Sequence, residues 1–236
     1  MRAVLYSATR NLYQDLIVSM KSLLYHTKVD KVYCFIEDDE LPYELPDFVK
    51  TINVTNQRWL IHNGANWVNN YSWMVLMRAI AFKFIDEPEV FSIDCDTIVR
   101  KDISAVFNTN ISEYCFAAVQ EDHTNLRTFY PYYNFGVVIL NLEKIKQYGE
   151  LIIDLINEAP FGCPEQDIMQ IVCKGQIMPV KNIYNAGFCT GKYNEEDVHI
   201  RHYIGQHDKK TMYASDEYRK YLFMPWEEVL ENKDKE

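Results

Sequence analysis

The chain has 236 residues, of which 48% are hydrophobic, 14% aromatic and 25% charged, with eight Gly and eight Pro. This composition can fill a large core, and it excludes disordered and collagen-like chains. The 34 acidic side chains outnumber the 24 Lys and Arg and leave a formal net charge of -10. Because an acidic surface repels a phosphate backbone, we do not expect nucleic acid as a partner. The length predicts a single domain over residues 1–236, with a frayed charged tail at 231–236.

The cysteines and the first residues bear on the compartment. No two cysteines form a Cys-x-x-Cys pair. The first residues lack the apolar region of a signal peptide, and no apolar run reaches the ~18 residues that cross a bilayer. These features predict a cytoplasmic protein without a transmembrane segment. Several cysteines lie in apolar runs, so we expect buried thiols at Cys34, Cys95, Cys115, Cys163, Cys173 and Cys189.

Short apolar runs alternate along the chain with segments of helical period. The alternation predicts an α/β fold with a mostly parallel central sheet and helices on both faces. Two long segments without a clear period, 53–70 and 187–196, are expected to be functional loops. The expected strands are residues 3–6, 32–36, 51–54, 90–93, 115–119 and 136–140. The expected helices are residues 12–24, 73–84, 143–156 and 167–173.

The sharpest local feature is Asp94-Cys95-Asp96, where an apolar strand runs out into two carboxylates. Side chains two residues apart on an extended chain point the same way, so Asp94 and Asp96 would converge while Cys95 turns toward the core. Open α/β sheets bind their ligands at the carboxyl ends of their strands. Two hard oxygen ligands suit Mn²⁺ or Mg²⁺, which complete their shells with substrate phosphates. A polar turn at the end of a strand is the alternative.

This segment resembles the D-x-D motif of glycosyltransferases with the GT-A fold, more particularly family 8. Other segments resemble that family in the same order, over residues 3 to about 210. The sequence departs from the family pattern at Arg10 and Asn11, where an acidic residue is common, and at Glu165, where Asp is usual. No Lys-Pro-Trp follows Gly205. The further segments are Ala8-Thr9-Arg10-Asn11-Leu12-Tyr13, Met77-Arg78-Ala79, Tyr132-Tyr133-Asn134-Phe135-Gly136-Val137, Glu165-Gln166-Asp167-Ile168-Met169 and His202-Tyr203-Ile204-Gly205.

The resemblance implies a metal-dependent, retaining hexosyltransferase. Its donor would be a nucleotide diphosphate sugar, with a UDP-hexose expected, and its acceptor a hydroxyl of a glycan or another molecule. His202 is implied as the third metal ligand beside Asp94 and Asp96. The implied catalytic residues are Gln166, Glu165 and Arg78, with the Gln166 amide beside the anomeric carbon. The residues implied to bind the nucleotide sugar are Ser7, Ala8, Thr9, Tyr13, Arg78, Asp94, Cys95, Asp96, Asn134, Glu165, Gln166, His202, Gly205 and Lys209.

Several of these residues also have a structural interpretation. Arg78 could lie on the solvated face of its helix, and Glu165 could complement the dipole of the helix that follows Pro164. Lys210 could take the place of Lys209, and Asn134 could belong to a turn. Three tryptophans could stack on sugars or pack in the core: Trp59, Trp67 and Trp73. The remaining histidines considered are expected to be structural or solvent-facing: His62, His123, His199 and His207.

Two other functions stay open. The chain could be a non-catalytic module that binds nucleotide sugars or glycans. Asp94-x-Asp96 also resembles the first motif of haloacid-dehalogenase-type phosphatases, whose first aspartate is a nucleophile. For a transferase we favour positioning and leaving-group stabilisation, although Asp167 and Glu165 keep a covalent sugar intermediate open. The segment 218–230, which mixes aromatic and charged residues, could dock on a partner.

Overall fold

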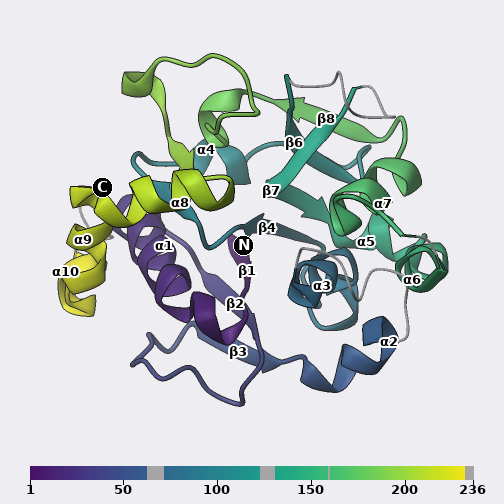
Figure 1. Cartoon of the computed structure of the whole chain (residues 1–236), viewed down its shortest axis with the longest axis horizontal. Coiled ribbons are helices and arrows are strands. Elements are labelled where there is room, and N and C mark those ends of the chain that lie inside the picture. Colours follow the sequence, from purple (N-terminus) through teal and green to yellow (C-terminus); the bar gives the residue numbers. More distant parts are fainter. Residues whose placement is uncertain (63–71, 123–130, 159, 232–236) are drawn as a thin grey trace.

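The computed structural model describes residues 1–62, 72–122, 131–158 and 160–231 (Figure 1). Its main sheet has seven strands in the order β3-β2-β1-β4-β7-β6-β8. Only β7 runs antiparallel to its neighbours, β4 and β6, so the predicted mostly parallel sheet is confirmed. The strands are β1 (Ala3–Ser7), β2 (Lys31–Ile36), β3 (Val49–Asn53), β4 (Glu89–Ile93), β6 (Phe116–Gln120), β7 (Tyr133–Asn141) and β8 (Ile177–Val180).

Helices cover both faces of this sheet, as the alternation of elements predicts. Figure 1 shows α1 with α8, α9 and α10 on one side, and α3, α5, α6 and α7 on the other. Two apolar clusters form the core: the first includes side chains of α1 and α9, and the second includes side chains of α3 and α7. Strand β1 is buried on both faces, because Val4 packs in the first cluster and Leu5 in the second. The helices are α1 (Tyr13–His26), α2 (Arg58–His62), α3 (Leu76–Ala79), α4 (Ser104–Phe107), α5 (Leu142–Lys146), α6 (Gly149–Glu158), α7 (Pro164–Val172), α8 (Gly205–Ala214), α9 (Asp216–Phe223) and α10 (Trp226–Glu231).

Two predicted helices are divided in the structure. The predicted helix at 73–84 consists of α3 between two short 3-10 turns. The predicted helix at 143–156 is split into α5 and α6. A turn at Gln147 and Tyr148 separates them, and Gly149, which begins α6, packs closely on Phe82, since an added Cβ would lie 2.9 Å from its Cζ. Such contacts between distant segments leave no trace in helical periodicity.

A second, two-stranded sheet brings a segment near residue 200 to the carboxyl end of β4. Strand β5 (Thr97–Val99) pairs antiparallel with β9 (Ile200–His202), and Thr97 lies opposite His202. The ladder continues past the strands, since Tyr203 N donates to the carbonyl of Asp96 at 2.8 Å. Neither β5 nor this pairing was predicted, because short strands carry little periodic signal. The pairing places His202 beside the carboxylates that follow β4.

The carboxyl-terminal helices pack on their own chain. Tyr218 and Tyr221 of α9 are buried in the first apolar cluster, and the buried Asp15 of α1 accepts hydrogen bonds from Tyr213 and Tyr218. Two aromatic side chains of the segment 218–230 thus make internal contacts, while Phe223 is exposed, and docking of this segment on a partner stays a prediction. Helix α10 includes residue 231, and the rest of the predicted tail lies outside the described residues.

The cysteines largely follow the prediction. Five of the six are buried, but Cys163 is partly exposed because it lies at the start of α7, so the prediction of a buried thiol is wrong there. Within the described ranges, no helix combines the length and the apolar character needed to span a bilayer.

Candidate active site

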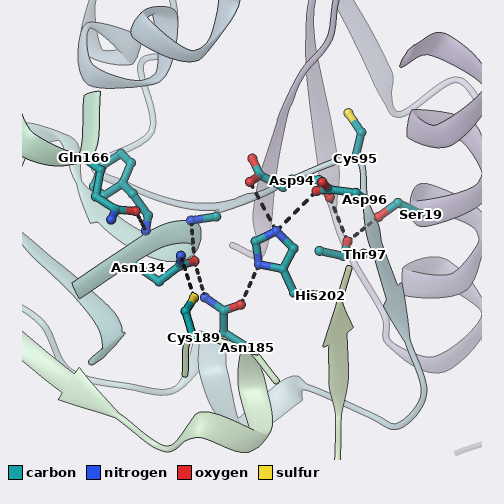
Figure 2. A network of polar contacts seen from close by, with 12 residues as sticks. Ser19, Asp94, Cys95, Asp96, Thr97, Asn134, Gln166, Asn185, Cys189 and His202 are labelled. Atoms are coloured by element: carbon teal, nitrogen blue, oxygen red, sulfur yellow. Dashed lines mark hydrogen bonds and ion pairs between the residues drawn. The ribbon is translucent and has the colours of Figure 1, made fainter. Parts of the chain in front are cut away.

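Three side chains of the kinds that can bind a metal ion meet beyond the carboxyl end of β4 (Figure 2). Nε2 of His202 lies 3.5 Å from Oδ2 of Asp94 and 3.3 Å from Oδ1 of Asp96. One ligand atom from each of these residues lies within 4.8 Å of the others. The predicted convergence of the two aspartates is thus confirmed. Cys95 is buried and points away from them, with its sulfur 3.6 Å from the carbonyl of Ser7, as the alternation of side chains requires.

Gly136 leaves the space in which this cluster forms. Strand β7 passes beside β4 here, and Asp94 N donates to the carbonyl of Gly136 at 2.7 Å. A Cβ at Gly136 would lie 2.2 Å from Cε1 of His202 and 2.7 Å from Oδ2 of Asp94. Any side chain at this position would therefore displace the imidazole and a carboxylate.

Opposing charges surround the two aspartates. Burial would raise the pKa of Asp96, but its hydrogen bonds to His202 and Lys209 and their charges outweigh this and lower the pKa to about 2. Nζ of Lys209 lies 3.1 Å from Oδ2 of Asp96. Burial raises the pKa of Asp94, and the positive charge of Arg78 offsets only part of that effect. Asp96 is thus ionised and ready to hold a cation.

Arg78 lies beneath the cluster and is only 3% exposed, so it does not belong to a solvated helix face. One terminal nitrogen is 2.6 Å from Oδ1 of Asp94 and 3.1 Å from the carbonyl of Phe135. The other is 2.7 Å from Oε1 of Glu165. The planar guanidinium therefore orients both carboxylates through separate N–H groups.

Helix α7 begins at Pro164 and brings two further predicted residues to the site. Gln166 is buried, with its Oε1 accepting from Phe135 N at 2.7 Å and its Nε2 donating to Glu121 at 3.1 Å. Asp167 accepts from the hydroxyl of Tyr132 at 2.6 Å and from Cys163 N at 2.9 Å. Both oxygens of Asp167 thus hold the start of the helix in place.

Asn134 joins this group from β7, together with two residues that the sequence interpretation missed. Nδ2 of Asn134 is 3.0 Å from Oε1 of Glu121, and its Oδ1 accepts from Nδ2 of Asn185 at 2.8 Å. Glu121 follows the apolar strand β6, whose carboxyl end lies at the same sheet edge as that of β4 because both run antiparallel to β7. The strand-end rule that singled out Asp94 could have found Glu121. Asn185 carries no comparable local signal.

The predicted nucleotide-binding loop is tied to the end of β2. Ser7 donates to the carbonyl of Met74 at 2.8 Å, and Ala8 N donates to Phe35 O at 3.0 Å. The hydroxyl of Tyr13 donates to Asp38 at 2.9 Å. Thr9 is partly exposed and precedes Arg10, which forms an ion pair with Asp38.

This ion pair bears on Arg10 and Asn11, where the family pattern often has an acidic residue. Glu37 accepts from the backbone N of Arg10 at 2.9 Å, and Asp38 pairs with its guanidinium. Acidic groups thus reach this loop from another segment of the chain, which a comparison of adjacent residues does not show.

Helix α8 presents Lys209 and not Lys210 to the cluster. Gly205 begins this helix with a φ of +78°, a conformation that glycine adopts without strain. Lys209 follows about one turn later beside Asp96, whereas Lys210 is exposed. The structure therefore separates the two lysines that the sequence left as alternatives.

The remaining predicted residues lie in different settings. Trp73 packs in the second apolar cluster, while Trp59 is exposed. His199 contacts the carbonyl of Asp102, and His207 is solvent-facing, so the expectation for these two histidines is confirmed. Trp67, His123 and the side chain of His62 lie outside the described residues.

The sequence matches a known family over most of its length: residues 3–209 fit the family model described as Glycosyl transferase family 8. The chain belongs to this family. Family 8 membership confirms the predicted glycosyltransferase family and speaks against the phosphatase alternative.

Relatives and solved structures agree with this assignment. The chain is 23% identical over 168 residues to glycosyltransferase GlyA of Streptococcus pneumoniae serotype 4, covering 66% of this chain and 23% of the relative. It is 34% identical over 107 residues to general stress protein A of Bacillus subtilis, covering 40% of this chain and 37% of the relative. The chain thus spans about a quarter to a third of the length of these relatives.

Two solved glycosyltransferases share the fold of this family 8 chain. The galactosyltransferase LgtC, solved with donor and acceptor sugar analogs, is 17% identical, with a TM-score of 0.74 over 95% of this chain and 98% of LgtC. GlyE of Streptococcus pneumoniae TIGR4 is 20% identical, with a TM-score of 0.69 over 98% of this chain and 62% of GlyE. These similarities confirm the predicted GT-A fold.

Proposed function

We propose that this family 8 chain transfers a hexose from UDP to an acceptor hydroxyl, on a glycan or another molecule, with retention at the anomeric carbon. The observation that carries the proposal is the cluster of Asp94, Asp96 and His202 at a strand end, with Lys209 beside it. A sugar diphosphate is an anion that a cation site and a lysine together can bind. The family assignment and the shared fold support the same donor class.

The donor set fits a divalent metal ion. Two carboxylates suit Mg²⁺ or Mn²⁺, and the imidazole favours Mn²⁺, the transition metal of the two. The space beside Gly136, which a Cβ would fill, keeps the imidazole within reach of both aspartates. Held by Asp94, Asp96 and His202, the ion would supply Lewis-acid stabilisation of the charge on the departing diphosphate.

The other residues would bind and orient the donor. Lys209 would exchange its contact with Asp96 for the diphosphate and offset its charge. Gly205 at the start of α8 would let the backbone approach the same group. Glu165 and Gln166 would contact the transferred sugar, because both lie on the first turn of α7. Glu165 shares Arg78 with Asp94, and Gln166 shares Glu121 with Asn134.

The contacts of the carboxylates favour retention by positioning over a covalent sugar intermediate. Asp167 is bound through both oxygens to Tyr132 and Cys163, and Glu165 is paired with Arg78. A nucleophile bound in this way would first have to break those contacts. We therefore propose that the reaction is promoted by orientation of the sugar and by stabilisation of the leaving group.

The test is release of UDP from UDP-hexoses in the presence of Mn²⁺. We expect slow release without an acceptor, lost on chelation and in an Asp96→Ala variant that remains folded by circular dichroism. Asp216→Ala is the matched control, because the Asp216 side chain is fully exposed on α9. Unchanged turnover in Asp96→Ala contradicts the metal role. Tight binding of UDP-sugars without UDP release identifies a binding module instead.

A further inference from the structure

A continuous path of hydrogen bonds joins Gln166 on α7 to His202 on β9, and Figure 2 shows its part from Asn134 to His202. Oε1 of Glu121 accepts from Nε2 of Gln166 and from Nδ2 of Asn134. Oδ1 of Asn134 accepts from Nδ2 of Asn185, and Oδ1 of Asn185 lies 2.8 Å from Nδ1 of His202. All five side chains are buried, so water does not compete for these bonds.

The direction of every bond in this path is fixed by its surroundings. A backbone N–H can only donate, and Gly136 N lies 3.0 Å from Oδ1 of Asn134. The amide oxygen of Asn134 is therefore the acceptor, and its NH₂ group faces the carboxylate of Glu121. Asn185 must then turn its own NH₂ group toward Asn134 and its oxygen toward His202. It follows that Nδ1 of His202 carries a proton and donates it to Asn185.

We propose that Asn185 is a positioning residue: its amide oxygen accepts the Nδ1–H of His202 and thereby fixes the ring with Nε2 directed at Asp94 and Asp96, where a cation would bind. This inference rests on the proposed metal-dependent function. Without the Asn185 side chain, the ring loses the acceptor that fixes its orientation. A histidine that binds a cation through one ring nitrogen is held by a hydrogen bond at the other, and loss of that bond weakens the binding of the cation.

The backbone keeps Asn185 beside His202 independently of its side chain. His202 N donates to the carbonyl of Ala186 at 2.9 Å, and Ala186 N donates to the carbonyl of Ile200 at 2.9 Å. The hydroxyl of Thr190 donates to the carbonyl of Asn185 at 2.6 Å. A substitution at 185 therefore changes the partner of Nδ1 while these bonds can hold the segment in register.

Two substitutions separate this role from a structural one. Asn185→Leu removes the acceptor for Nδ1 and the donor to Asn134, whereas Asn185→Asp keeps an acceptor for Nδ1 and loses only the donor. The Kd for Mn²⁺, measured by electron paramagnetic resonance titration, should rise about 10- to 100-fold in Asn185→Leu. It should not rise in Asn185→Asp. Equal weakening in both variants overturns the proposal in favour of a packing role, as does unchanged affinity in Asn185→Leu.

A second measurement reports the Nδ1 proton directly. ¹⁵N NMR of histidine-labelled protein, with the ring of His202 assigned by its loss in His202→Asn, should show a protonated Nδ1. An unprotonated Nδ1 in the wild type overturns the proposal even if no variant folds. Asn182→Leu is the matched control, since Asn182 lies in the same segment and its side chain donates to the carbonyl of Lys192 near the surface. It should leave both readouts unchanged.

Steady-state UDP release adds a third readout. In Asn185→Leu the Mn²⁺ concentration for half-maximal rate should rise, while kcat at saturating Mn²⁺ stays close to that of the wild type. If wild-type protein binds no Mn²⁺, the proposed function fails, and the NMR measurement still decides whether Nδ1 carries a proton toward Asn185. If wild-type protein binds Mn²⁺ and Asn185→Leu binds it equally well, only the role of Asn185 fails.

Discussion

Replacing Arg78 by methionine leaves Asp94 and Glu165 without the cation that lies between them. Arg78 is 3% exposed and donates to both carboxylates at 2.6 and 2.7 Å. Removing one partner of a buried ion pair typically costs about 3–5 kcal/mol, because a charge is left without compensation. For a chain of this size, about 1 kcal/mol lowers Tm by about 2–4 °C, so Arg78→Met should lower Tm by about 6–20 °C.

The pH dependence of this loss tests its electrostatic origin. Burial already raises the pKa of Asp94 and of Glu165, and loss of the Arg78 charge would raise both further. The folded variant then binds protons more readily than the unfolded chain, so its stability should increase as pH falls. We expect the difference from wild type, measured by urea unfolding, to be smaller at pH 5 than at pH 7.

Arg100→Met is the matched control, because Arg100 also pairs with two carboxylates, those of Glu195 and Glu217, but near solvent. Exposed pairs contribute up to about 1 kcal/mol each, so its loss should be the smaller one. Adding Glu165→Gln to Arg78→Met should recover part of the stability, since one uncompensated charge disappears. A loss below about 1 kcal/mol in Arg78→Met, or an equal loss at both pH values, refutes this reasoning.

Three further predictions concern single residues. Gly136→Ala should abolish Mn²⁺ binding and lower the free energy of unfolding in urea by about 1–3 kcal/mol, because its Cβ would lie 2.2 Å from Cε1 of His202. Gly162→Ala is the control and should be tolerated, because its Cβ would make only an ordinary van der Waals contact. Lys209→Met should lower kcat for UDP release by about 10²-fold without weakening Mn²⁺ binding, while Lys210→Met should match the wild type. Burial and nearby charge lower the pKa of His26 from 6.5 to about 4, so the unfolded chain takes up a proton first and stability should fall as pH decreases across that range. His26→Gln should flatten this part of the curve in urea unfolding, and an unchanged slope would contradict the assignment.

The sequence by itself determined the features that depend on neighbouring residues. Apolar runs located the main parallel strands. The alternation of side chains along an extended segment placed Asp94 beside Asp96 and turned Cys95 the other way, into the core. The order of the family-like segments led to the correct fold, even though Arg10, Asn11 and Glu165 depart from the family pattern. These inferences hold because strand periodicity and short motifs are local properties of the chain.

Only the tertiary structure decided which distant residues share the site. Strand β9 brings His202 to the end of β4, and the antiparallel course of β7 brings the ends of β4 and β6, with Glu121, to one edge. The burial of Arg78 between two acids and the contact of Asn185 with His202 likewise depend on the packing of separate elements. The physical reason is that side-chain packing and hydrogen bonding join segments many residues apart, whereas sequence periodicity reports only on the segment that carries it.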